Sequence, residues 1–236
     1  MEDITPGAQD AAPLGGHSVE CGSQHGLREG TGGLGPTPRD TRPDRTTRFV
    51  ETTLGNLTYT ELAPLLGERV VRLEESIQVG AYHFHPLEEE LLLQFHRSIC
   101  GDLTPDWAGK WRDVEVTVGP LTPPAPHLLP VMMRDYALDL QARWTAANSE
   151  DTDLTLEFLA FAEGRFLTIH PFRDFNGRTI RVFLSELLRR LDLPLVNLAP
   201  EEESARTTYF SALEAADRLD WQPLIEIWKV RLSSEN

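Results

Sequence analysis

Cysteine is scarce in this sequence. Its 236 residues include only Cys21 and Cys100, too few for a cysteine metal cage or a disulfide framework. Basic residues are also outnumbered, since 22 Lys and Arg stand against 37 Asp and Glu, for a formal charge of −15. This balance argues against a protein whose task is to bind nucleic acid or an anionic membrane.

Long apolar runs are missing as well. No run approaches the roughly 20 residues that cross a bilayer. The first residues also lack the basic region followed by an apolar stretch that is typical of a secretion signal. The sequence therefore predicts a cytoplasmic, reduced, globular protein with neither a membrane nor a nucleic acid as its partner.

The first 45 residues lack Phe, Tyr and Trp but hold nine of the 17 glycines and five of the 17 prolines. Such a segment buries too little apolar area to offset the entropy cost of ordering it. We therefore expect a disordered tail over 1–45 and one folded domain over 46–236.

Helical patterns dominate the folded part. Apolar spacing, first-turn acids or proline, and terminal glycines predict helices over 60–67, 86–101, 128–147, 152–169, 178–191, 201–218 and 221–232. The alternating segment 113–118, followed by Gly and Pro, predicts a β-hairpin flap near 113–127 with an edge open to pairing, or else a Pro-rich surface loop. The predicted fold class is all-α with this small β element.

The segment His170-Pro-Phe-Arg-Asp-Phe-Asn-Gly-Arg-Thr-Ile-Arg181 combines groups suited to phosphate chemistry. A helix that starts near Gly177 presents unpaired amides to an anion. Arg178 and Arg181 lie at i and i+3 and could bind phosphate. Asp174 could hold Mg²⁺, and His170 can accept a proton near neutral pH. Each residue alone has an ordinary structural explanation, but together they indicate a nucleotide-using transferase.

This segment resembles the signature of the Fic (Fido) family, His-x-Phe-x-(Asp/Glu)-Gly-Asn-(Gly/Lys)-Arg-x-x-Arg. Seven of the eight specified positions match, and Phe175 stands where the family usually has glycine. The resemblance extends to 95–112, which is similar to the helix and Trp-Ala-Gly-Lys turn of these proteins, and to 114–127, which looks like their flap.

The resemblance implies a Fic-type helical domain that transfers AMP from ATP to a Ser, Thr or Tyr hydroxyl of a target protein beside the flap. His170 would then be the general base, and Asp174 would coordinate Mg²⁺. The nucleotide-binding segment would include Phe172 as the anchor of the loop and Asn176 as part of the anion cradle.

Three further residues complete the nucleotide site that the resemblance implies. Gly177 would contribute to the cradle, and Arg178 would bind the β-phosphate region. Arg181 would hold the terminal phosphate or pair with an inhibitory glutamate.

Two alternatives to AMP transfer follow from this segment. One is a Fic-type kinase that transfers the γ-phosphate, although Gly177 stands where those kinases have Lys. The other is a non-catalytic Fic-like interaction module whose nucleotide site is blocked by Phe175.

A candidate inhibitory motif lies upstream of the His170–Arg181 segment. Many Fic proteins carry an inhibitory (Ser/Thr)-x-x-x-Glu-(Gly/Asn) motif, and Thr47 to Thr52 resembles it, with Glu51 as the candidate inhibitory residue. A helix-capping pair is the simpler interpretation of the same spacing. If Glu51 does not inhibit, a separate antitoxin-like protein could supply the glutamate.

Overall fold

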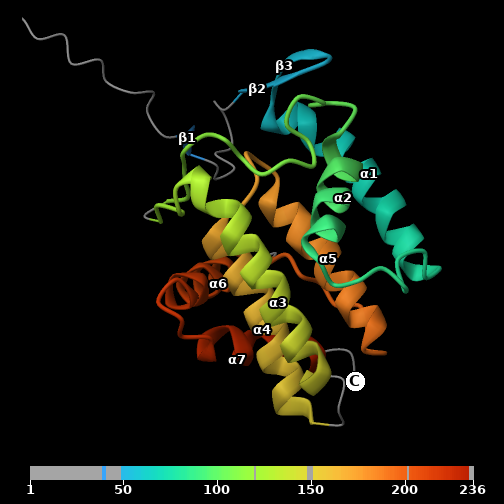
Figure 1. Ribbon diagram of the computed structural model, residues 1–236, viewed down its shortest axis with the longest axis vertical. Helices are drawn as coiled ribbons and strands as arrows, with labels where there is room; N and C mark the ends of the chain where they lie inside the picture. The colour runs from blue at the N-terminus through green and yellow to red at the C-terminus, as the bar shows by residue number, and fades with distance from the viewer. Residues whose placement is uncertain (1–38, 41–48, 120, 148–150, 201, 234–236) are drawn as a thin grey trace, which may run out of the picture. The chain divides into compact units, whose positions relative to one another are not determined.

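The computed structural model describes residues 39–40, 49–119, 121–147, 151–200 and 202–233. These residues form seven α-helices and four short strands, and they all belong to one compact unit that spans Pro38–Asn236 (Figure 1). Apart from Arg39 and Asp40, the tail predicted over 1–45 lies outside the described residues. Within the described ranges, no helix is long and apolar enough to cross a bilayer.

The first helix, α1 (Tyr59–Gln78), is much longer than predicted. It begins with a capping box in which the Thr58 side chain and the Glu61 carboxylate each bond the other's backbone amide. The expected stop at Gly67 is wrong. Glycine costs about 1 kcal/mol inside a helix, and burial of Leu73 and Ile77 beyond it offsets that cost.

The buried helices α4 (Thr152–Ile169) and α5 (Asn176–Arg190) form the centre of the fold. Around them pack α1, α2 (Glu89–Cys100), α3 (Leu129–Ala147), α6 (Glu203–Ala216) and α7 (Gln222–Ser233). In Figure 1, α3 runs alongside α4, while α1 and α2 lie on the side of α5. The apolar character of α4 on most sides predicted its central position, and the structure confirms it.

The C-terminal helices are fastened to α4 by a buried acid. Glu163 is fully buried and accepts hydrogen bonds from Tyr209 Oη at 2.7 Å and from Arg231 Nη1 at 2.8 Å. One residue along, Gly164 lies so close to α6 and α7 that a Cβ there would stand 2.8 Å from Leu224 Cδ1. The Glu163 hydrogen bonds and the close packing at Gly164 together fix the positions of α6 and α7 against α4.

The strands form two small sheets. β2 (Phe49–Thr52) and β3 (Gly55–Thr58) make an antiparallel hairpin that the sequence did not predict. β1 (Arg39–Asp40) pairs in parallel with β4 (Val116–Thr117), which lies in the predicted flap.

The flap, residues 113–127, adopts a tight hairpin turn. Val118 and Leu121 exchange two backbone hydrogen bonds, of 3.0 and 3.1 Å, across this turn. Within the described residues, the part of 113–118 that pairs with another strand is Val116–Thr117, so the ladder there is shorter than the alternation suggests. The η1 turn (Pro126–Leu128) then leads from the flap into α3.

Candidate active site

The loop that joins α4 to α5 contains the predicted site. It begins at His170, with φ 50°, and ends at Phe175, with φ 58°. Both are non-glycine residues in the left-handed region, a conformation that costs about 1–3 kcal/mol each and persists only where surrounding contacts enforce it. These two residues turn the chain sharply out of one central helix and into the next.

His170 caps the C-terminus of α4, and its amide donates to the Phe166 carbonyl at 2.9 Å. Its ring Nδ1 lies 3.3 Å from the Leu167 carbonyl oxygen. A carbonyl can only accept, so this contact places the ring proton on Nδ1 and the basic lone pair on Nε2. The backbone thus selects the tautomer that suits a general base.

Asn176 closes the loop on itself. Its side-chain oxygen accepts from the Phe172 amide, and its side-chain amide donates to the Phe172 carbonyl, both at 2.9 Å. These two bonds hold the loop in shape and use one of the two N–H donors of the Asn176 side-chain amide, so its part in an anion cradle stays a prediction. The fully buried Phe172 ring anchors the same loop in the core.

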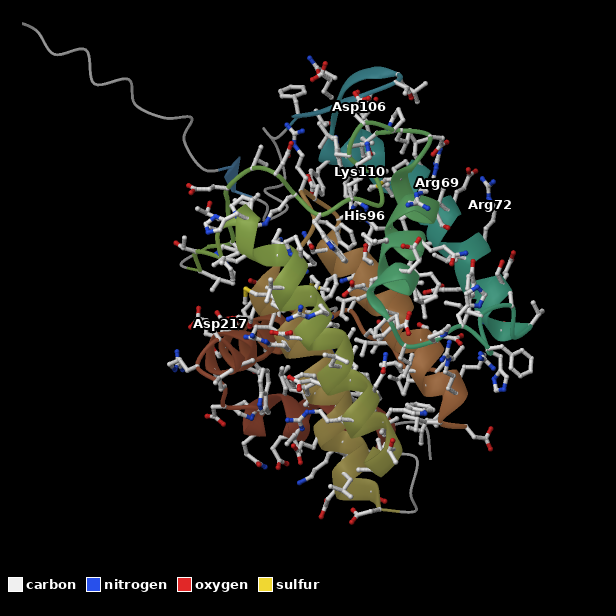
Figure 2. The ribbon with its side chains drawn as sticks, viewed as in Figure 1. Arg69, Arg72, His96, Asp106, Lys110 and Asp217 are labelled. Atoms are coloured by element: carbon white, nitrogen blue, oxygen red, sulfur yellow. The ribbon has the colours of Figure 1, made fainter. Side chains whose placement is uncertain are left out.

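A buried histidine of α2 packs against this loop and bonds to its backbone. His96 Nδ1 accepts from the Gly109 amide at 2.8 Å, so Nε2 carries the proton and faces the Asp174 carbonyl oxygen at 3.2 Å. Burial lowers the pKa of His96 to about 3, so the ring is neutral. Figure 2 shows His96 beside the turn that carries Asp106 and Lys110.

The Asp174 carboxylate is oriented by two donors. Its Oδ1 accepts from the Phe175 amide at 2.8 Å and from the Tyr59 hydroxyl at the start of α1. No group of three or more His, Cys, Asp or Glu in the described ranges could hold a metal ion. A single fixed carboxylate nevertheless fits Mg²⁺, which commonly takes one or two carboxylates together with substrate phosphate oxygens.

The ring of Phe175 is buried, not projecting into the site. It packs 5.6 Å from the Trp107 ring and 6.2 Å from the Tyr59 ring, measured between centroids. Only 3% of the residue is exposed. The backbone therefore adopts the positive φ for which glycine is usual at this place, and the added ring fills a gap between α1 and the Trp107 turn.

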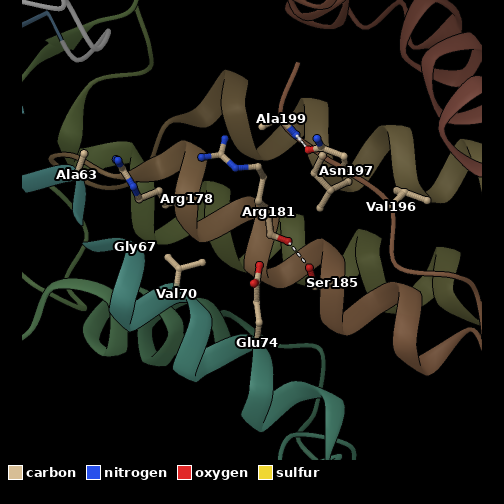
Figure 3. Close-up of a pocket in the computed structure, with 11 residues that line it drawn as sticks. Ala63, Gly67, Val70, Glu74, Arg178, Arg181, Ser185, Val196, Asn197 and Ala199 are labelled. Atoms are coloured by element: carbon tan, nitrogen blue, oxygen red, sulfur yellow. Dashed lines mark hydrogen bonds between the residues drawn. The ribbon is translucent and has the colours of Figure 1, made fainter. Parts of the chain in front are cut away.

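A cavity of about 340 Å³ opens beside the first turns of α5. Figure 3 shows Arg178 and Arg181 on α5, with α1 facing them and the segment 196–199 nearby. Its lining residues are Ala63, Gly67, Val70, Glu74, Arg178, Arg181, Ser185, Val196, Asn197, Leu198 and Ala199. The volume suits a small ligand, and two arginines near a helix N-terminus favour an anion.

The absence of a side chain at Gly177 leaves room for the Arg181 guanidinium. A Cβ at position 177 would lie 3.3 Å from Arg181 Nη1, so a larger residue there requires this guanidinium to shift by a small amount. Burial lowers the pKa of Arg181, which means that the site holds a largely desolvated cation. Such a cation binds an anionic group more strongly than a solvated one would.

Comparison with known families identifies this region. Residues 86–188 match the model of the Fic/DOC family. This part of the chain is similar to Fic domains. The flap and the His170–Arg181 segment both lie within the match.

Curated proteins with Fic in their names are also similar to this chain. Protein adenylyltransferase fic-1 of Caenorhabditis briggsae is 32% identical over 141 residues, which is 60% of this chain but only 26% of that protein. The chain thus matches about a quarter of the length of this curated relative. Protein adenylyltransferase Fic of Drosophila melanogaster is 31% identical over 134 residues, 57% of this chain and 26% of that protein.

Solved structures share the fold. BepC of Bartonella tribocorum, solved with bound AMPPNP, superposes with a TM-score of 0.61 at 16% identity, over 83% of this chain and 98% of that one. Fic-1 of C. elegans gives a TM-score of 0.56 at 23% identity, over 76% and 51%. At these identities the likeness establishes the fold alone.

One acidic residue at the cavity escaped the sequence analysis. Glu74 of α1 is half-buried and lines the cavity opposite Arg181 (Figure 3). Burial raises the pKa of its carboxyl, and Arg181 acts in the opposite direction. Because the sequence predicted a helix end at Gly67, nothing placed Glu74 beside the Fic motif. The continued apolar stripe past Gly67 is the signal that could have found it.

Glu51 lies on an exposed strand. It belongs to β2 and pairs with Asn56 of β3, so it is neither in a helix nor a helix-capping residue. Its inhibitory role stays a prediction. The acids that act on the Arg181 pKa in the described part of the chain are Glu163 and Glu74.

Proposed function

We propose that the chain is a protein adenylyltransferase that moves AMP from ATP to a hydroxyl side chain of another protein. The observation that carries the proposal is the cavity beside the first turns of α5, in which Arg178 and Arg181 line one wall of a space suited to phosphates. The printed names of the curated relatives support AMP transfer, and BepC was solved with an ATP analogue bound.

In the proposed reaction the target hydroxyl oxygen attacks the α-phosphorus of ATP. His170 Nε2 takes the hydroxyl proton, an O–P bond forms, and the bond from the α-phosphorus to the bridging oxygen breaks to release pyrophosphate. The contact of Nδ1 with the Leu167 carbonyl holds the ring in the correct tautomer for this proton transfer. The backbone of His170 is fixed as the C-cap of α4, and this holds the ring in one position for the proposed proton transfer.

The cationic side chains of α5 stabilise the phosphates in this reaction. Arg178 and Arg181 bind the β- and γ-phosphate oxygens, while the first-turn amides of α5 face the same anion. Asp174 would hold Mg²⁺, which would supply positive charge to the phosphates. Tyr59 and the Phe175 amide keep the carboxylate oriented for that role.

The location of Phe175 supports a catalytic domain over a blocked interaction module. Its ring packs on Trp107 and Tyr59, and the cavity walls are formed by other residues. Gly177 supports AMP transfer over γ-phosphate transfer, since the related kinases have a lysine at this place.

Three finer points belong to the same proposal. The protein target presents its hydroxyl beside the flap, and regulation comes from Glu51 or from an antitoxin-like partner. We place the protein in the cytoplasm, in keeping with the buried free thiol of Cys100. None of these roles requires nucleic acid or a membrane.

Label transfer tests the proposal. Lysate protein is incubated with the purified chain and either α-³²P-ATP or γ-³²P-ATP, alongside His170→Ala and Glu51→Gly. The proposal expects protein-bound α label that is lost in His170→Ala. Label from γ-³²P-ATP alone would instead establish a kinase. If no label transfers and calorimetry shows no Mg-ATP binding, the chain is an interaction module.

A further inference from the structure

Arg112 is a buried cation that connects two segments far apart in sequence. Only 3% of the residue is exposed, and it lies just before the flap, after the Trp107–Lys110 turn. In the described part of the chain, its side chain makes four hydrogen bonds, and all four end on backbone carbonyl oxygens. Such a set of partners suggests a role in holding the backbone in place, because a carbonyl oxygen carries no charge for an ion pair.

Two of these carbonyls belong to the end of α4. Arg112 Nε donates to the His170 carbonyl at 2.9 Å, and Nη2 lies 3.5 Å from the Ile169 carbonyl. The Arg112 backbone amide adds a third link, to the Pro171 carbonyl at 2.9 Å. The left-handed backbone of His170 is thus held from outside its own helix.

The other two carbonyls belong to the two arms of the flap. Nη1 donates to the Val114 carbonyl at 3.0 Å, before the Val118–Leu121 turn, and Nη2 donates to the Pro124 carbonyl at 2.6 Å, after it. One guanidinium therefore holds both arms of the flap together and holds them against the backbone of His170.

We propose that Arg112 is a positioning residue that sets the register between the flap and His170. The inference rests on the proposed AMP transfer, in which the flap holds an extended target segment and His170 deprotonates its hydroxyl. A target that pairs with the flap is positioned relative to Arg112, and so is the base. Arg112 is not among the residues that line the cavity proposed for ATP.

Arginine suits this role where lysine does not. Its planar fork presents donors in several fixed directions, whereas the lysine ammonium is a single point on a flexible stem. Burial lowers the pKa of Arg112 to about 10, with the exposed Glu115 acting in the opposite direction, so the group remains charged at neutral pH. Arg112→Lys keeps the charge and loses the fork.

The first test separates the two substrates. Initial rates of α-label transfer are measured for the wild type and Arg112→Lys, with varied ATP and with varied acceptor. The acceptor is the purified lysate protein that the wild type labels most strongly. Arg112→Lys should raise the KM for the acceptor about tenfold or more, because a flap no longer held in register binds the acceptor less tightly, and misplacement of the base by about 1 Å should also lower kcat. The KM for ATP should stay within about twofold.

The control is a second buried arginine, changed in the same way. Arg190 bonds Glu186 and the Tyr82 carbonyl at the other end of α5, about 20 Å along that helix from the loop. Arg190→Lys should lower stability while leaving both KM values unchanged. If the two variants change the KM values alike, or if Arg112→Lys changes only the KM for ATP, the proposal is wrong.

A second measurement does not depend on activity. Amide hydrogen exchange should rise in Arg112→Lys both in the flap and at residues 169–170, by about tenfold, and should stay at the wild-type level there in Arg190→Lys. Faster exchange in only one of the two segments would contradict the proposal that Arg112 joins the flap to His170. If the wild type transfers no α label, the proposed function fails, and the exchange experiment still decides whether Arg112 joins the two segments.

Discussion

The rings of His96 and Phe172 lie flat against each other, with centroids 3.8 Å apart and planes 1° from parallel. One ring belongs to α2 and the other to the loop that carries the proposed base. Because Gly109 and the Asp174 carbonyl use both nitrogens of His96, the stack connects the Trp107–Lys110 turn to the catalytic loop. The neutrality of His96 is therefore a condition for the shape of the site.

The first prediction concerns pH. The folded-state pKa of His96 is lowered to about 3, while the unfolded chain binds this proton below about pH 6.5. The contribution of His96 to stability is thus present above pH 6.5 and is lost as pH falls, at about 1.4 kcal/mol per pH unit. His96→Gln should be less stable than the wild type at pH 7, and the difference should narrow towards pH 5.

Urea unfolding at pH 7, 6 and 5 measures this effect. His85→Gln is the control, because His85 is exposed and its removal should leave the pH dependence as in the wild type. A constant difference between His96→Gln and the wild type across these pH values would contradict the prediction.

The second prediction concerns Phe175. Phe175→Gly relieves a positive φ but removes a buried ring, so the free energy of unfolding should fall by about 2–4 kcal/mol. Affinity for Mg-ATP should stay within about twofold, since the ring packs on Trp107 and Tyr59. Denaturant unfolding and calorimetry measure the two quantities, and a tenfold gain in affinity would mean that the ring narrows the nucleotide site.

The third prediction compares two helical glycines. A Cβ on Gly164 would meet Leu224, Trp221 and Ala216 within 3.0 Å, whereas nothing lies within 4 Å of a Cβ on Gly67. Gly164→Ala should destabilise the protein by about 1–3 kcal/mol because α6 and α7 must move. Gly67→Ala should stabilise it by about 1 kcal/mol through helix propensity. Thermal or urea unfolding of the pair measures both, and equal signs would refute the assigned helix contacts.

The fourth prediction concerns the acid in the cavity. Glu74→Gln removes a carboxylate that faces Arg181 in a space proposed for phosphates, so the Kd for Mg-ATP should fall about threefold to tenfold. Glu75→Gln is the matched control, since Glu75 is exposed on the same helix. Calorimetry measures the change. Weaker binding in Glu74→Gln would show that Glu74 assists the nucleotide.

Helix α4 was predicted with its observed bounds, 152–169, from its mostly apolar run, and the structure shows Asp151 as its N-cap. The motif residues were found because their spacing along a loop and one helix turn is local. The β2–β3 hairpin was missed because its strands are only four residues each.

Other contacts could not be predicted from local spacing. Arg112 acts on His170 from 58 residues away, and Tyr59 reaches Asp174 across 115 residues. Patterns along one chain report which face of a helix is buried, but they do not report which distant group lies against it. Glu74 was missed because the helix was predicted to stop at Gly67, so the second half of α1 was not expected near the site.

The pairing of Arg39–Asp40 with β4 has a consequence for any protein that approaches the flap. Eight residues separate Asp40 from the start of β2, so this segment is a tethered competitor with an effective concentration that does not change on dilution. An incoming segment that uses the same edge of β4 must displace it. Under the proposed function, occupancy of that edge would depend on the concentration of the target relative to the effective concentration of the tethered Arg39–Asp40 strand.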